Sequence, residues 1–311
     1  MGTTYKVVYD DANATNYKAA VDSLLVAINA DVNTYDPNSI ISQFNKNTLS
    51  DSLLAAANAH YDANFEMALA VAGETNGAFD PTIMPLVNYW GFGYTGKEPI
   101  NHIDTLAIDS IMQFIGLDLL EWTKSPQGLS IQKQNSKLQL DFGGIAKGYA
   151  LDKVGELLER NGVKNYMVEI GLEVKTKGTN PGGRAWTIGI NTPKEGANVT
   201  DVQEIVQMNN LSVATSGNYR QSYEVDGRKA AHIINPKTGY PEVTNLLSAS
   251  VFTENCALAD AYATAFIVMG LDAAYAFAAN APELEALFIY GKEDGTMGVK
   301  MTPGAEAILV K

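Results

Sequence analysis

The 311-residue sequence contains little cysteine and little positive charge. Its single cysteine, Cys256, excludes an intramolecular disulfide and a thiolate-rich zinc site. Lysine and arginine number 22 against 35 aspartates and glutamates, which gives a net charge of −13. Because a phosphate backbone attracts basic surfaces, this charge disfavours nucleic acid as a partner. A phosphorylated small molecule can still bind where local donors or a metal ion neutralise it.

Long apolar runs are also missing. No stretch reaches the roughly 18 apolar residues that span a bilayer, and the opening residues, MGTTYKVVYDDANATNY, lack the apolar part of a signal peptide. We therefore expect either a cytosolic chain or a mature segment whose export signal has been removed. With 46% hydrophobic and only 18% charged residues, the composition predicts a buried core rather than long disordered tails.

The Gly-x-Gly-x-x-Gly motif of a Rossmann dinucleotide site does not follow the first predicted strand, Thr3–Asp10. Apolar spacing predicts helices over residues 17–35, 51–75, 148–162 and 256–270. Further strands are predicted for 165–178, 184–193, 211–217, 245–254, 284–292 and 297–310, with a hairpin over Gly128–Phe142 that turns at Gln134–Ser136. Antiparallel-looking strands between blocks of helices favour an α+β fold, as one large domain or two joined lobes.

The stretch LDFGGIAKGYALDKV, Leu140–Val154, predicts a turn from a strand into a helix. Its two adjacent glycines let the backbone approach a ligand closely, and the helix that follows presents its N-terminal amides to an anion. Lys147 adds a positive charge at the start of that helix. An ordinary turn with a solvated lysine is an equally good interpretation of this stretch alone.

A second candidate lies in ENCALADAYATAFIVMG, where Asp260 and Thr264 are four residues apart and so share one helix face. A carboxylate and a hydroxyl are oxygen ligands suited to Mg²⁺, which completes its shell with water or phosphate. Alternatively, Thr264 bonds to its own helix and Asp260 is a cap or an ion-pair partner. A carboxylate in so apolar a helix is costly unless it is paired, which slightly favours the functional interpretation.

Two more segments combine polar and aromatic residues. His232, at the end of a predicted strand, precedes the turn Asn235–Gly239 and could act as a general base or donate a hydrogen bond to a phosphate, although a structural role is the simpler interpretation. In GAFDPTIMPLVNYWGFG, Asp80 could accept hydrogen bonds from the edge of a flat ring. The aromatic residues around it are equally well explained as core.

Eight segments, in their order along the chain, resemble the ApbE family of FAD:protein FMN transferases. They are MGTTYKVVY, NTYDPNSIISQFN, GAFDPTIMPLVNYWGFG, DFGGIAKGYALD, MVEIGLEV, SGNYR, HIINPKTGYP and ADAYATAFIVMG. The resemblance covers nearly the whole chain. It implies a single ApbE-like domain over residues 1–311 with a T-fold-like α+β architecture, antiparallel sheets packed with helices, and an FAD cleft between two lobes.

The resemblance also implies a reaction and its residues. FAD and Mg²⁺ bind, FMN is transferred to a Thr or Ser hydroxyl of an acceptor protein through a phosphoester bond, and AMP leaves. Asp260, Thr264 and the carbonyl of Ala146 would hold the metal, and His232 would orient or deprotonate the hydroxyl near the phosphate. The remaining implied residues would contact FAD: Met1, Tyr35, Ala78, Phe79, Asp80, Asp141, Lys147 and Ser216.

Two positions depart from the family pattern. Leu172 stands in Gly171-Leu172-Glu173 where the family has a second glycine, and would strain the backbone or narrow the pocket if that site needs a positive φ or close ligand approach. Asn235 replaces the usual aspartate of HIIDP. An FAD pyrophosphatase that yields FMN and AMP, or an FAD-binding protein without catalysis, would share these residues. The family's usual location predicts a periplasmic or cell-envelope protein, lipid-anchored in its precursor.

Overall fold

The structure, a computed structural model, describes residues 2–49, 59–95, 98–126, 128–194, 201–219 and 221–310. The chain divides into two compact units, each assembled from separate segments. We call Met1–Leu25, Ile145–Arg220 and Thr244–Lys311 the sheet unit, and Val26–Gly144 and Gln221–Val243 the helical unit. The predicted single domain and the predicted FAD cleft are not tested by this division and stay predictions.

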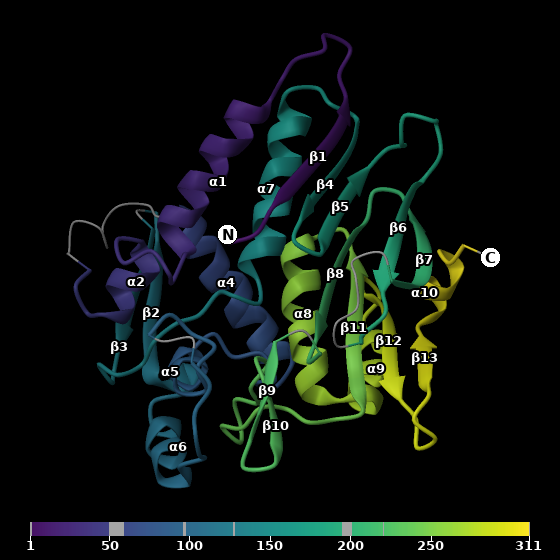
Figure 1. Cartoon of the computed structure of the whole chain (residues 1–311). Helices are drawn as coiled ribbons and strands as arrows, with labels where there is room; N and C mark the ends of the chain where they lie inside the picture. Colours follow the sequence, from purple (N-terminus) through teal and green to yellow (C-terminus); the bar gives the residue numbers. More distant parts are fainter. Residues whose placement is uncertain are drawn as a thin grey trace. The chain divides into compact units, whose positions relative to one another are not determined.

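The sheet unit is built on one seven-stranded sheet in which every neighbouring pair is antiparallel (Figure 1). Buried and less buried residues alternate along β4, as expected for a strand with one face on the core. In sheet order the strands are β1 (Tyr5–Asp10), β4 (Asn165–Ile170), β5 (Glu173–Lys177), β8 (Ser212–Gly217), β11 (Leu246–Thr253), β12 (Glu285–Gly291) and β13 (Met297–Met301).

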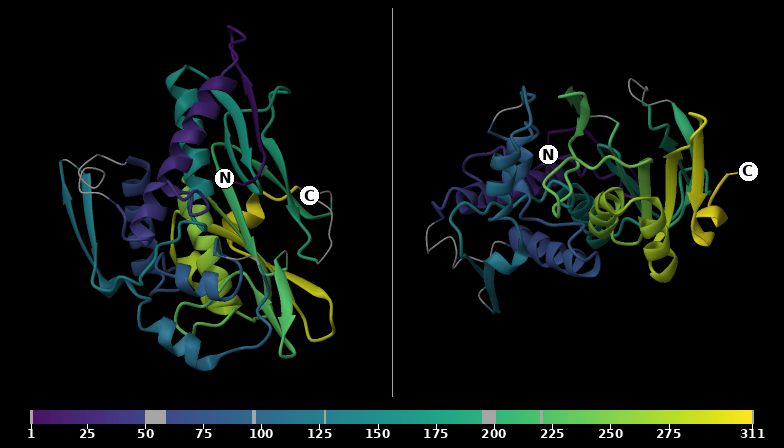
Figure 2. Two further views of the ribbon diagram at one scale, coloured as in Figure 1. Left: turned by 60° about the vertical axis from the view of Figure 1, so that its left-hand side comes forward. Right: turned by 90° about the horizontal axis from the view of Figure 1, so that it is seen from below.

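Both faces of this sheet are covered. The helices α7 (Ala146–Arg160), α8 (Cys256–Met269) and α9 (Leu271–Asn280) pack on one face, with α7 against β4 and β5 and α8 against β8 and β11 (Figures 1 and 2). On the other face, the hairpin β6 (Trp186–Asn191) and β7 (Val202–Met208) and the short helix α10 (Pro303–Ala307) enclose a second apolar core. The candidate residues of α7 and α8 therefore lie on the helix-covered face.

The helical unit contains short elements around its own core. Trp90 and Ile108 are buried there, and the indole N–H of Trp90 donates to the carbonyl of Gly239 at 2.9 Å, which ties the segment 221–243 to the rest of the unit. The elements are α1 (Lys18–Val32, which begins in the sheet unit), α2 (Ile40–Asn45), α4 (Ala59–Glu74), α5 (Met84–Tyr89), α6 (Thr105–Met112), the 3₁₀ helix η1 (Leu117–Leu119), β2 (Leu120–Ser125), β3 (Gly128–Lys133), β9 (Ser222–Val225) and β10 (Arg228–Ala231).

The predicted hairpin over Gly128–Phe142 is wrong. Strand β3 pairs with β2, which precedes it, and not with residues 137–142. The side chain of Asn45 explains why: its amide oxygen accepts the N–H of Leu140 at 2.7 Å, and its amide nitrogen donates to the Leu140 carbonyl at 2.8 Å. The next residues pair elsewhere too, since Gln139 forms a parallel bridge with Ile83 and the Asp141 N–H donates to the Pro81 carbonyl. Alternation of apolar residues cannot reveal these partners.

Two other predicted elements change in extent. The C-terminal tail is a strand only as far as Met301, because Pro303 then begins α10, where its fixed φ suits a first helical residue. The helix predicted over residues 51–75 is present as α4, while 51–58 lie outside the described residues. Among the described helices, none has both the length and the hydrophobicity that crossing a bilayer requires.

Candidate functional site

Lys147 and Asp260 come together in the sheet unit. Lys147 lies in the first turn of α7 and Asp260 in the second turn of α8. The Lys147 ammonium lies 3.5 Å from Asp260 Oδ1 and also pairs with the carboxylate of Glu173. The second oxygen of Asp260 accepts the main-chain N–H of Gly148 at 3.1 Å. The Lys147 side chain is half-buried and is held between two buried carboxylates, so it is not a freely solvated lysine.

Two charged residues of strand β5 hold α7 in place through ion pairs. Glu173 and Lys175 are two residues apart and so point to the same face of the sheet. Glu173 pairs with Lys147 of α7, and Lys175 pairs with Asp152 of α7 at 2.9 Å. Sliding the helix would bring like charges together, so these two pairs favour one placement of α7 on the strand.

Sequence reasoning assigned no role to Glu173 or Asp152. A signal for Glu173 was present in the strand EVKTK, where every second residue is charged although the strand lies inside the sheet. A charge on a buried strand needs a partner, and the helix that precedes it in the chain supplies one. Asp152 carried no comparable signal, because a single aspartate in an amphipathic helix is ordinary.

The implied metal ligands all belong to the sheet unit, on α7 and α8. Thr264 lies one helical turn after Asp260, and its hydroxyl shares a hydrogen bond of 3.1 Å with the hydroxyl of Ser216 on β8. Ala146 is the buried first residue of α7, next to Lys147. A carboxylate, a hydroxyl and a carbonyl are hard oxygen donors, so the chemistry of this set fits Mg²⁺. Among the residues that the structure describes, no group of three or more His, Cys, Asp and Glu side chains could hold a metal ion.

Burial and ion pairing compete in the electrostatics of this cluster. Burial, helped by the charge of Glu173 and opposed by that of Lys147, raises the pKa of Asp260 to about 6. Burial alone would lower the pKa of Lys147, but the charges of Asp260 and Glu173 outweigh it and raise that pKa above its ordinary value. The lysine is therefore a permanent cation, while the carboxylate of Asp260 gains or loses its proton near pH 6.

The helical unit brings together a second set of predicted residues. The N–H of Asp141 donates to the carbonyl of Pro81 at 2.7 Å, which joins it to the Asp80 segment. The hydroxyl of Tyr35 donates to the carbonyl of Phe92 at 3.1 Å, and the ring of Phe92 lies 6.4 Å from that of His232 between centroids. These four predicted FAD contacts thus share one region of the unit.

In each of the two aspartates of this region, one carboxylate oxygen accepts hydrogen bonds from residues of the same segment. Asp80 Oδ1 accepts hydrogen bonds from the N–H and the hydroxyl of Thr82 at 2.8 and 2.6 Å, and Asp141 Oδ1 accepts the N–H of Gly143 at 2.8 Å. Burial raises the pKa of both carboxyls, and these hydrogen bonds partly offset it. Burial, with the charge of Asp141, likewise raises the pKa of Tyr35.

The other predicted FAD contacts differ in exposure. Ala78 and Phe79 are each 5% exposed, so their side chains belong to the core. This agrees with the alternative that the aromatics of the segment are packing residues. His232 follows strand β10 directly, and its N–H donates to the Gln221 carbonyl at 3.2 Å. Met1 lies outside the described residues.

Both departures from the family pattern are accommodated locally. The positive φ of +68° falls on Gly171 and not on Leu172, so the expected backbone strain at Leu172 is absent. The amide nitrogen of Asn235 donates to the carboxylate of Glu242 at 2.7 Å, and its oxygen accepts the N–H of Lys237 at 2.9 Å. An aspartate at position 235 would instead place two carboxylates in contact.

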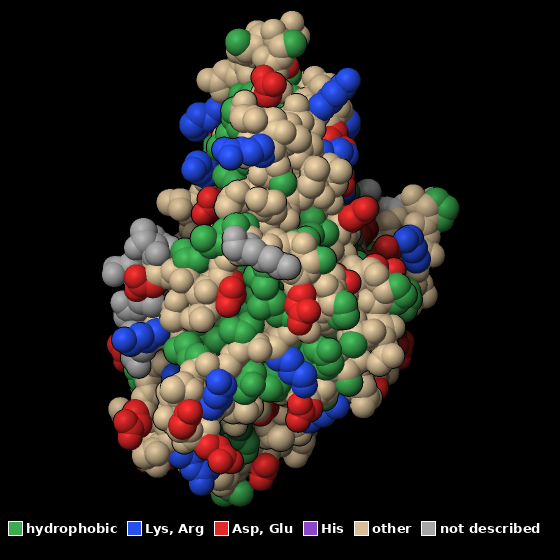
Figure 3. All heavy atoms as spheres, turned by 90° about the vertical axis from the view of Figure 1, so that its right-hand side faces the viewer, with side chains coloured by type: hydrophobic (Ala, Val, Ile, Leu, Met, Phe, Trp, Pro, Cys, Tyr) green, Lys and Arg blue, Asp and Glu red, His purple; other side chains and the backbone are tan. Residues whose placement is uncertain are grey.

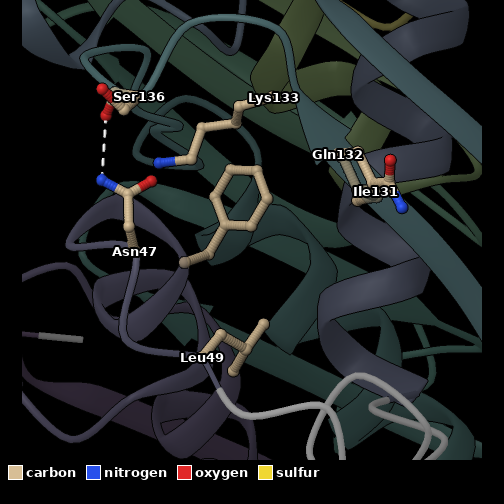
Figure 4. Close-up of a pocket in the computed structure, with 7 residues that line it drawn as sticks. Asn47, Leu49, Ile131, Gln132, Lys133 and Ser136 are labelled. Carbon is tan, nitrogen blue, oxygen red and sulfur yellow. Dashed lines mark hydrogen bonds between the residues drawn. The ribbon is translucent and has the colours of Figure 1, made fainter.

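A separate pocket of about 270 Å³ in the helical unit contains none of the predicted site residues (Figure 4). Lys133 lines it and donates to the carbonyls of Asn45 at 3.3 Å and Leu138 at 3.0 Å, with its ammonium 4.6 Å from the centre of the Phe44 ring. Burial lowers the pKa of Lys133 to about 8. These bonds join β3 to the end of α2, which is a sufficient structural role for the lysine.

Comparison with known proteins places this geometry in a family. The model of the ApbE family matches residues 1–288. The chain belongs to the ApbE family. An FAD:protein FMN transferase of Vibrio cholerae is 34% identical over 299 residues, which cover 95% of this chain and 86% of that relative. One from Haemophilus influenzae is 35% identical over 283 residues, which cover 88% and 80% of the two chains.

Solved structures of ApbE proteins share the fold. The flavin transferase ApbE of Vibrio cholerae has a TM-score of 0.86 at 34% identity, covering 99% of this chain and 96% of its own. The flavinyl transferase ApbE of Pseudomonas stutzeri has a TM-score of 0.82 at 29% identity, covering 99% and 94%. The predicted family and its α+β fold are therefore confirmed.

Proposed function

We propose that this ApbE protein transfers FMN from FAD to a Thr or Ser hydroxyl of an acceptor protein and releases AMP, with Mg²⁺ held by Asp260, Thr264 and the Ala146 carbonyl. The observation that carries this proposal is the cluster in the sheet unit. Its oxygen donors and the Lys147 ammonium lie on the first turn of α7 and on the second and third turns of α8, which packs against α7. The names of the relatives support the flavin chemistry.

The residues of the sheet unit suit a diphosphate substrate. Lys147 is a permanent cation that Glu173 and Asp260 hold in place, so it can face phosphate oxygens without having to be ordered first. Mg²⁺, when bound, supplies positive charge against the negative charge that gathers on the diphosphate. The Ser216 hydroxyl, already bonded to Thr264, keeps the threonine oxygen in one orientation.

The transfer breaks one bond and forms one. The acceptor oxygen attacks the phosphorus of the FMN half, the bond from that phosphorus to the bridging oxygen breaks, and AMP leaves with the bridging oxygen and its charge. The hydroxyl must lose a proton as it attacks, and the family resemblance gives this role to His232. Tyr35, Asp80 and Asp141 are proposed to recognise FAD with the main chain at Ala78 and Phe79, and Met1 remains a weaker candidate.

The test separates transfer from hydrolysis. The protein is incubated with FAD and Mg²⁺, with and without a candidate acceptor, and AMP, free FMN and bound FMN are measured by chromatography. The proposal predicts AMP release that depends on the acceptor and equals the FMN bound to it. Rapid free FMN without acceptor would indicate the pyrophosphatase, and stoichiometric FAD binding without any AMP would indicate a binding protein.

We also propose a periplasmic or cell-envelope location with a lipid anchor in the precursor, on the family resemblance alone. Fractionation of cells that express the full-length gene tests it, because the proposal predicts the protein in the membrane or periplasmic fraction. Recovery in the cytosolic fraction alone would overturn it.

A further inference from the structure

A second buried carboxylate of α7, Asp152, binds the beginning of α8. Its Oδ1 accepts the N–H of Cys256 at 3.0 Å, and its Oδ2 accepts the N–H of Ala257 at 2.9 Å. These are the first two residues of α8, whose N–H groups have no partner within their own helix. Asp152 is 9% exposed and is not among the residues predicted for the reaction.

Lys175 completes this arrangement. Its ammonium lies 2.9 Å from Asp152 Oδ1 and donates at 2.7 Å to the carbonyl of Glu254, just before α8. The absence of a side chain at Gly155 makes room for it, since a Cβ there would lie 3.2 Å from Cδ of Lys175 and 2.5 Å from the hydroxyl of Tyr166. Asp152 and Lys175 therefore hold both the entry into α8 and its first turn.

The two helices cap each other. Asp260 of α8 accepts the N–H of Gly148 in the first turn of α7, while Asp152 of α7 accepts two N–H groups from the first turn of α8. Each aspartate is also paired with a lysine, Lys147 or Lys175. Between them the backbones approach so closely that a Cβ on Gly148 would lie 2.1 Å from the Cys256 carbonyl oxygen.

We propose that Asp152, held by Lys175, is a positioning residue that fixes the register of α8 on α7 and so places Asp260 and Thr264 against the Ala146 carbonyl. This inference rests on the proposed metal site. A metal ion with three protein oxygens on two helices is sensitive to small shifts between them, because Mg²⁺ requires nearly ideal octahedral geometry. Loss of the Asp152 carboxylate frees α8 at its start, one turn before Asp260.

The experiment measures metal binding directly. Mn²⁺ is titrated into the full chain with saturating FAD, and the free ion is counted by electron paramagnetic resonance for the wild type and for Asp152→Asn. The amide keeps the size of the side chain but cannot accept two N–H groups and a lysine together. We expect the Mn²⁺ dissociation constant to rise by at least about tenfold, as for other residues that orient metal ligands.

Two control variants separate positioning from general stability. Glu159→Gln removes another lysine-paired carboxylate of α7, one bonded to Tyr166 and Lys177 rather than to α8. Val206→Ala opens the core on the opposite face of the sheet and should lower the melting temperature. Both should bind Mn²⁺ within about twofold of the wild type, given additivity between distant sites.

The outcomes are distinct. A wild-type chain that binds no Mn²⁺ contradicts the proposed function, whereas an Asp152→Asn chain that binds it as tightly as wild type contradicts only the positioning role. A loss of affinity in Val206→Ala that matches its loss of stability would also overturn that role. If Asp152→Asn does not fold, Lys175→Met takes its place in the same titration. The positioning role predicts that Lys175→Met binds Mn²⁺ more weakly than the wild type. Unchanged Mn²⁺ binding by Lys175→Met would contradict that role.

Discussion

Asp260 is subject to two opposing effects, burial and metal binding. Burial raises its pKa to about 6, so its charged form is less stable in the folded than in the unfolded chain. The unfolding free energy of the metal-free protein should therefore fall as the pH rises from about 4 to about 6, and this loss persists above pH 6. A bound cation would reverse the effect, because it stabilises the folded state by mass action.

Asp260→Asn should separate these effects in thermal melts. In EDTA at pH 8 we expect the variant to melt above the wild type, with the difference shrinking below about pH 4, where the wild-type carboxyl is protonated in both states. Excess Mg²⁺ should raise the melting temperature of the wild type alone. A variant less stable than the wild type in EDTA at pH 8 would show that hydrogen bonding, rather than burial of charge, dominates at this residue.

The hydrogen bond between Asn235 and Glu242 can be tested by exchanging the amide and the carboxylate between the two positions. Asn235→Asp would put two carboxylates at a contact that is now 2.7 Å, and we expect a loss of about 1–2 kcal/mol in unfolding free energy at pH 8. Adding Glu242→Gln should restore most of it, because a glutamine amide can donate to the new aspartate. Chemical denaturation of the single and double variants measures the coupling, and a double variant no better than Asn235→Asp would contradict the pairing.

Among the elements, α7 and α8 carry Lys147, Asp260 and Thr264, so their packing determines how these residues are arranged. The sequence predicted both helices and the shared face of Asp260 and Thr264, because these features depend on local spacing. It could not predict that Gly148 packs directly against the backbone at the start of α8. Nor could it predict that Glu173 holds Lys147, because such contacts depend on which strand a helix packs against.

Gly148→Ala tests that contact. Its Cβ would lie 2.1 Å from the main-chain oxygen of Cys256, which cannot move without shifting α8, so we expect a loss of about 2–4 kcal/mol in chemical denaturation. Gly73→Ala is the matched control, since Gly73 lies in α4 and a Cβ there meets nothing within 4 Å. That substitution should be neutral or stabilising by up to about 1 kcal/mol. Equal effects of the two substitutions would contradict the tight contact between α7 and α8.

Which segments form strands and which form helices was likewise predictable from local residue spacing. Which strands pair with each other was not. Residues 128–133 read correctly as a strand, yet their partner is the preceding strand β2, because Asn45 satisfies the backbone of Leu140. Residues 139–141 also pair with residues 81–83. These contacts with distant parts of the sequence could not be predicted from alternation, which assigned β3 to the wrong partner.

At the scale of the whole molecule, the net charge of the protein repels the anionic diphosphate of FAD. The chain carries −13, and on the face drawn in Figure 3 acidic and basic side chains are interspersed. The Lys147 cation does not offset this charge, because it is paired with two carboxylates. Long-range repulsion should therefore slow the encounter with the anionic diphosphate.

This repulsion predicts an unusual salt dependence. At constant Mg²⁺, the association rate constant of FAD, followed by stopped-flow flavin fluorescence, should rise by about two- to fivefold between 20 and 200 mM salt, as the field is screened. Uncharged riboflavin serves as the control and should show little change. A rate that falls with salt would mean that a local basic field, rather than the net charge, governs the approach.

The most direct test of the account is the intact mass of a candidate acceptor protein after incubation with FAD and Mg²⁺. With the wild-type chain we predict the mass of one added FMN residue, lost when the acceptor's hydroxyl residue is replaced by valine and absent with Asp260→Ala. An unchanged acceptor mass while FAD is consumed to free FMN and AMP would contradict the transferase and identify a hydrolase.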